Sequence, residues 1–235
     1  MAFGIVGYSA AFAFVCAIVC FLAVLRKYSR QRQGLTLIFA FFLAAYAMIT
    51  LTYALRGFYL IGDPTEILLW TLSNYLYIVI TVPLALFLLY PLLRQTKGQG
   101  SYYVLWAVIA AIAFIVVFNT SMIAISQIEF TFTDNYEFAH YRLVYPPIPN
   151  VYIITLFLDV MVSNVSLVLL GISYRKETDS FYRQKALLLV VGWAITTYGQ
   201  LFFLDPSLVV LNTPAILTGA ILVTIGVTRS QPKQS

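Results

Sequence analysis

Residues 3–25 read FGIVGYSAAFAFVCAIVCFLAVL, and Arg26 and Lys27 follow directly. No charged side chain interrupts this segment, and a helix of about 20 apolar residues is long enough to cross the hydrocarbon core of a bilayer. No basic segment precedes it and its positive charge comes behind it, which is unlike a cleaved signal peptide. We therefore expect a membrane-spanning helix that the mature protein retains.

Similar apolar segments recur along the rest of the chain. Of its 235 residues, 61% are hydrophobic and only 10% are charged, whereas about 25% of the residues in a soluble domain are charged. Few residues remain for a second domain, so we predict an all-α membrane protein with a single domain over residues 1–235. Its seven transmembrane helices are expected at approximately 3–25, 35–55, 67–93, 102–123, 151–173, 186–204 and 208–228.

The basic residues indicate the orientation of this bundle. All but two of the 14 Lys and Arg residues lie in the tail or in the connections after the first, third and fifth helices, and the two exceptions are Arg56 and Arg142. Short connections rich in Lys and Arg stay in the cytoplasm. We therefore predict a multi-pass protein of the cell membrane with its N-terminus outside and its C-terminus in the cytoplasm.

The connection between the fourth and fifth predicted helices is longer than the others. Residues 127–133 read QIEFTFT, in which apolar and polar side chains alternate as they do in β-strands. A turn at Asp134 and Asn135 separates them from a second strand-like segment, residues 136–145. We predict a small external β-hairpin between helices 4 and 5, with three apolar side chains on one face: Ile128, Phe130 and Phe132.

Polar side chains within the apolar segments are the candidate site residues. An unsatisfied polar group inside a bilayer costs several kcal/mol, and Asp159 is the only ionisable residue deep in a predicted span. Two interpretations stay open: a ligand pocket beneath the hairpin, or a hydrogen-bond network that only holds the helices together. The residues of the hypothetical pocket are Asp159, Asn74, Asn119, Asn164, Gln200 and Asn212.

Several functions conflict with the residues present. No lysine lies in the predicted seventh helix, which excludes a retinal Schiff base, and a lone His140 does not provide two haem ligands. Cys16 and Cys20 lie four residues apart on one predicted helix, where a disulfide is disfavoured. We expect no metal, no cofactor, no enzymatic activity and no nucleic acid. The expected partners are the lipid bilayer and another membrane or cytoplasmic protein.

Several motifs follow one another in a characteristic order. They are the basic connection after the first helix, LWTLSNYLYI (69–78) followed by Pro83, FNT (118–120) before the aromatic hairpin, YPP (145–147), FYRQKALLL (181–189) before the sixth helix, and the closing Arg229. Over nearly the whole chain, this order resembles the seven-helix N-terminal sensor region of archaeal and bacterial histidine kinases. In such kinases the seventh helix continues into a signalling helix and catalytic domains, whereas here SQPKQS (230–235) follows. The resemblance therefore implies a sensor region without the kinase, and no catalytic residue is carried over.

These observations support three functional hypotheses. The first is a sensor-like module that binds an external or membrane-borne ligand and acts through a partner protein. The second is a non-catalytic accessory subunit of a larger membrane complex. The third, a small transporter built from a parallel repeat, rests on the similar positions of Asp63-Pro64 and Asp205-Pro206 before helices that contain proline. The first, second and sixth helices contain no proline, which argues against the transporter.

Overall fold

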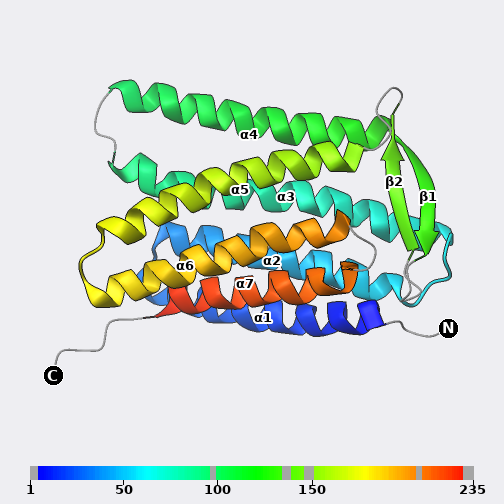
Figure 1. Cartoon of the computed structure of the whole chain (residues 1–235), viewed down its shortest axis with the longest axis horizontal. Helices are drawn as coiled ribbons and strands as arrows, with labels where there is room; N and C mark the ends of the chain where they lie inside the picture. The colour runs from blue at the N-terminus through cyan, green and yellow to red at the C-terminus, as the bar shows by residue number, and fades with distance from the viewer. Residues whose placement is uncertain (1–4, 96–98, 134–138, 146–150, 205–207, 230–235) are drawn as a thin grey trace.

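The structure is a computed structural model that describes residues 5–95, 99–133, 139–145, 151–204 and 208–229. Within these residues, the chain forms seven α-helices, one 3-10 helix and one two-stranded sheet. The helices lie side by side along the long axis of the molecule (Figure 1). In chain order the elements are α1 (Ile5–Gln31), α2 (Gly34–Arg56), α3 (Pro64–Gln95), α4 (Gln99–Ile125), β1 (Gln127–Thr133), β2 (Ala139–Val144), α5 (Val151–Lys176), α6 (Ser180–Gly199), η1 (Gln200–Leu204) and α7 (Val209–Thr228).

Helix α1 illustrates how the sequence suits a lipid environment. Ala10, Ala13 and Ala17 are at most 1% exposed, and their spacings of three and four residues place them on one helix face. Small side chains there let the neighbouring helices approach closely. The opposite face carries large apolar side chains that are 55–65% exposed: Tyr8, Phe12, Val15, Val19 and Leu22. Hydrocarbon solvates such a face, whereas contact with water would be unfavourable.

Four helical segments of the described residues are long and apolar enough to cross a membrane: Gly7–Gln31, Gly34–Arg56, Ser180–Phe202 and Leu211–Thr228. They indicate a membrane-embedded protein that crosses the bilayer more than once, in agreement with the sequence analysis. Helices α3, α4 and α5 contain side chains that lie outside the described residues. The total of seven spans therefore stays a prediction.

The apolar core has two parts. The larger part joins α1, α2, α6 and α7, and in it the ring centroids of Phe42 and Trp193 lie 6.1 Å apart. Helices α6 and α7 pack closely because a Cβ at Gly219 would lie 2.5 Å from the carbonyl oxygen of Gly192. The smaller part, which we call the Trp70 cluster, joins α3 to α4 and consists of Trp70, Ile78, Met122 and Ile123.

The two predicted strands are present and pair antiparallel between α4 and α5. They lie at the end of the bundle where α1 begins (Figure 1). Phe130 pairs with Tyr141 and a β-bulge follows before Phe132, so the regular alternation of β1 is interrupted there. On the other face, Arg142 Nη2 lies 2.7 Å from Glu129 Oε2 in an exposed ion pair. The turn residues and the Phe132 side chain lie outside the described residues.

Candidate functional site

A buried ion pair joins the end of α2 to the start of α3. Arg56 is the last residue of α2, Glu66 lies in the first turn of α3, and both residues are only 3% exposed. Arg56 donates from Nε to Glu66 Oε1 at 2.7 Å, and its Nη2 donates to the same oxygen. A buried charge is strongly destabilising unless it is paired and hydrogen-bonded. Each of these two side chains can therefore stay buried in its charged form only while it is paired with the other.

The connection between α2 and α3 brings the two charges together. Gly62 has a φ of 82°, a conformation that is sterically easy only for glycine. Asp63 Oδ1 accepts a hydrogen bond from the Thr65 N–H at 2.7 Å and so caps α3, whose first residue is Pro64. Glu66 then falls in the first helical turn, where the helix dipole favours negative charge.

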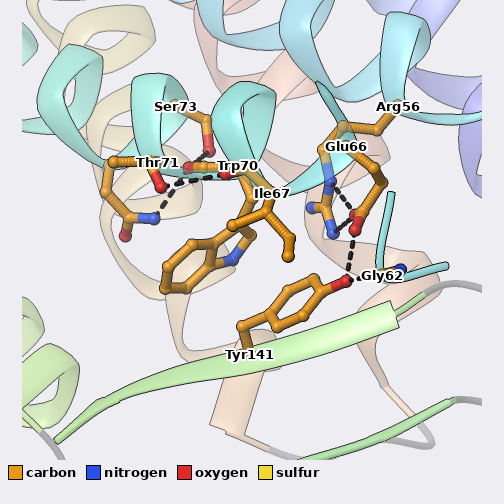
Figure 2. A network of polar contacts seen from close by, with 9 residues as sticks. Arg56, Gly62, Glu66, Ile67, Trp70, Thr71, Ser73 and Tyr141 are labelled. Atoms are coloured by element: carbon orange, nitrogen blue, oxygen red, sulfur yellow. Dashed lines mark hydrogen bonds and ion pairs between the residues drawn. The ribbon is translucent and has the colours of Figure 1, made fainter. Parts of the chain in front are cut away.

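Tyr141 of β2 attaches the hairpin to this ion pair (Figure 2). Its hydroxyl donates to Glu66 Oε2 and accepts from the Gly62 N–H at 3.1 Å. The centroid of its ring lies 5.4 Å from that of Trp70 and 5.9 Å from that of Phe130. A single side chain thus links the hairpin to α3 and to the α2–α3 connection. We call Arg56, Glu66 and Tyr141 the hairpin anchor.

The charges of the hairpin anchor stabilise the contacts that Tyr141 makes with Arg56 and Glu66. The Arg56 guanidinium lies 5.5 Å from the ring centroid of Tyr53 and 5.9 Å from that of Tyr141, within the range of a cation–π contact. Burial and the Glu66 carboxylate raise the pKa of Tyr141 to about 12. The hydroxyl of Tyr141 therefore remains a hydrogen-bond donor at neutral pH.

The sequence analysis did not predict the hairpin anchor, because it treated Arg56 only as a charge outside the basic connections and did not single out Glu66. One signal was available. Arg56 directly ends an apolar segment on the side with few basic residues, and Glu66 begins the next segment after a short connection. The third member, Tyr141, is distant in the sequence, and no local pattern indicates its contact with Glu66.

The predicted pocket residues of α3 and α4 are both buried. Asn74 Nδ2 donates to the backbone carbonyl of Trp70 at 2.9 Å, within its own helix. Asn119 is 1% exposed, and its Oδ1 has no hydrogen-bond partner among the described residues. Among the predicted pocket residues whose side chains the structure describes, Asn119 is therefore the one whose buried side-chain oxygen can still accept a hydrogen bond.

The predicted pocket residues near α6 make separate contacts between helices. Asn164 of α5 accepts from the Tyr198 hydroxyl of α6 at 2.6 Å, and Asn212 of α7 donates to the carbonyl of Gly199 at 2.9 Å. Gln200 is half-buried and begins η1. Asp159 lies in α5, but its side chain is outside the described residues. The contacts of Asn164 and Asn212 fit the interpretation in which polar groups hold helices together.

An apolar groove of about 610 Å³ lies between α2, α3 and α4. Its walls include Phe41 and Met48 of α2, Val79 of α3 and Val116 of α4. Tyr75 also lines the groove and at the same time packs against the Trp70 cluster, which Tyr141 contacts from the other side. Packed side chains thus connect the groove to the hairpin anchor.

No protein-family model matches the chain, and no curated protein matches it in sequence. The resemblance to the sensor region of histidine kinases therefore rests on the order of the motifs and stays a prediction. Within the described part of the chain, no group of three or more His, Cys, Asp and Glu side chains could hold a metal ion.

Proposed function

We propose that this chain is a sensor-like membrane module of seven transmembrane helices, with its N-terminus and hairpin outside and its C-terminus in the cytoplasm. It binds an external or membrane-borne ligand and acts through a partner protein. The observation that carries this proposal is the continuous packing from the groove, through Tyr75 and the Trp70 cluster, to the hairpin anchor.

The hairpin anchor has the properties of a two-state element. With Tyr141 in place, the ion pair of Arg56 and Glu66 is buried and fully bonded. If the hairpin lifted, Tyr141 would lose its hydrogen bonds with Glu66 and Gly62 and water would reach the ion pair, so a docked and an open state would differ in both bonding and solvation. A ligand shifts such an equilibrium only if it binds one state more tightly.

The groove supports a membrane-borne ligand as the input. Its lining is almost entirely apolar, with hydroxyl groups only on Tyr75 of α3 and Thr120 of α4 among the lining residues, so it suits a lipophilic ligand better than a water-soluble one. Occupation of the groove would act on Tyr75 and, through the Trp70 cluster, on Tyr141. Helix α3 carries Glu66 in its first turn and runs to the opposite end of the bundle (Figure 1), so it connects the hairpin anchor to the end where a cytoplasmic partner would bind.

The test is purification of the full chain from its native membrane in mild detergent, with identification of the proteins and lipids that travel with it. We expect a protein with a kinase, cyclase or methyl-accepting domain, together with a bound lipophilic molecule. Ala44→Phe would fill the groove and should remove that molecule, whereas Ala113→Phe, on an exposed part of α4, should retain it. A chain that purifies without a signalling protein and without a bound lipophilic molecule would contradict the sensor proposal.

The alternative is a non-catalytic accessory subunit. The observation that favours it is the strongly apolar exposed surface of α4, on which Trp106, Phe114 and Val117 are 64–67% exposed. In that case a redox or transport subunit should co-purify in a fixed ratio. Recovery of such a complex would replace the sensor proposal.

A further inference from the structure

Basic side chains from two helices converge on the end of a third, at the end of the bundle opposite the hairpin (Figure 1). Lys27 of α1 donates from Nζ to the carbonyl oxygens of Thr228 and Arg229, at 3.1 and 3.2 Å. Lys185 of α6 donates to the same Arg229 oxygen at 3.4 Å. Both ammonium groups are therefore held within a few ångströms of each other, at the backbone of Arg229.

The end of α7 does not neutralise this charge. A helix C-terminus carries the equivalent of roughly half a negative charge, whereas Lys27, Lys185 and Arg229 carry three positive charges. The ion pairs among the described residues join Arg56 to Glu66 and Arg142 to Glu129, and neither involves these three side chains. The arrangement thus caps α7 and leaves a surplus of positive charge.

The three cationic groups retain hydrogen-bonding capacity. An ammonium group has three N–H donors, and among the described residues Lys27 uses two of them and Lys185 uses one. The Arg229 guanidinium lies 5.4 Å from the ring centroid of Phe181, which positions its planar donors at the start of α6. Several donors around a positive centre suit a phosphate group, which has several acceptor oxygens.

The same three helices expose apolar side chains next to this cluster. Ile225, one helical turn before Arg229 and on the same face of α7, is 46% exposed, and Leu25 and Leu187, two residues from Lys27 and Lys185 along α1 and α6, are 38 and 44% exposed. A phosphate with attached acyl chains would contact both the cations and this apolar surface. A free phosphate ion would use only the cations, and so the surface favours an amphiphile.

We propose that Lys27, Lys185 and Arg229 form a binding site for the phosphate headgroup of an anionic membrane phospholipid. The site is independent of the groove and the hairpin anchor, which lie in other parts of the bundle. Binding would bridge α1, α6 and α7 and would hold the end of α7 in place.

The experiment is a lipid titration of the full chain in mild detergent, followed by native mass spectrometry, with phosphatidylglycerol compared with phosphatidylcholine. We expect preferential binding of phosphatidylglycerol. Each cation that contacts the bound headgroup is expected to contribute about fivefold to the affinity for anionic lipid. The double variant Lys27→Gln/Lys185→Gln should therefore lose roughly 25-fold. The matched control, Arg175→Gln/Lys176→Gln, removes the same charge from the exposed end of α5 and should change the affinity less than twofold.

A second variant distinguishes a loss of lipid binding from a loss of folding. Arg229→Gln removes a cation but keeps the backbone carbonyl that both lysines contact, and it should lose about fivefold in affinity. Equal losses in the double variant and its control, unchanged affinity in Arg229→Gln, or no preference between the two lipids would overturn the proposal. Displacement of phosphatidylglycerol by millimolar inorganic phosphate would show a site for free anions instead.

Discussion

The hairpin anchor shows how a few residues can decide the stability of one end of the bundle. Arg56 and Glu66 are buried charges of opposite sign that bond to each other. Glu66→Leu leaves Arg56 without its carboxylate, and loss of one partner of a buried pair costs about 3–5 kcal/mol. The double variant Arg56→Met/Glu66→Leu should recover most of this loss. Thermal unfolding of the wild type, Arg56→Met, Glu66→Leu and the double variant in detergent checks the prediction, and simple additivity of the two single losses would contradict it.

Tyr141 offers a test of the hairpin contact alone. Tyr141→Phe keeps the ring between Trp70 and Phe130 but removes the hydroxyl that donates to Glu66. A hydrogen bond to a charged group contributes about 1.5–3 kcal/mol. The substitution should therefore lower the free energy of unfolding by an amount in that range. Tyr145→Phe, at an exposed position in the same segment, is the control and should leave stability unchanged.

The titration of Tyr141 should also appear in the pH dependence of stability. Its pKa is raised from an ordinary value of about 10 to about 12, so the native state retains the phenolic proton more tightly than the unfolded state does. The corresponding stabilisation is complete below pH 10 and disappears as the pH rises toward 12. The difference in stability between the wild type and Tyr141→Phe should shrink over this interval. A constant difference from pH 9 to pH 12 would show that the hydroxyl is not coupled to Glu66.

At the scale of the elements, the contact between α6 and α7 depends on the absence of side chains. A methyl group at Gly219 would collide with Thr196 Oγ1 and with the carbonyl of Gly192. Gly219→Ala should therefore separate the two helices and destabilise the protein by a few kcal/mol. Gly171→Ala, in α5, meets nothing within 4 Å and should stabilise its helix by up to about 1 kcal/mol. Unfolding in detergent compares the two, and equal effects would contradict the packing argument.

The elements differ in how well their sequences predicted them. Residues 3–25 predicted a helix because apolar length is a local property, but α1 continues to Gln31, since Arg, Lys and Gln are good helix formers beyond the apolar segment. The alternation in residues 127–133 predicted β1, but not the bulge after Phe130.

The contacts between distant elements were harder to predict from the sequence. The polar residues Asn164 and Asn212 were singled out as candidate pocket residues, but their hydrogen-bond partners depend on how the helices pack. The hairpin anchor and the groove depend on contacts between segments that are far apart in the sequence. Apart from the positions of Arg56 and Glu66 on either side of one short connection, a single sequence carries no signal for such contacts.

At the scale of the whole molecule, the two ends of the bundle carry different chemistry. The hairpin end holds a neutral, buried ion pair, whereas the opposite end gathers cations around the end of α7. This asymmetry agrees with the distribution of basic residues, which favours a cytoplasmic position for the second end. Between the two ends, the described helices expose apolar side chains along their length, as α1 illustrates with Tyr8 through Leu22.

The predicted orientation can be measured with reporters. A reporter fused after Ser235 should be cytoplasmic, and one inserted at Asp134 should be external. Three helices, α5, α6 and α7, separate these two positions in the chain, and an odd number of crossings puts them on opposite sides. Segments of α6 and α7 are long and apolar enough to cross a membrane, so the experiment bears chiefly on α5, which carries Asp159. Reporters on the same side would mean that one of the three helices does not cross.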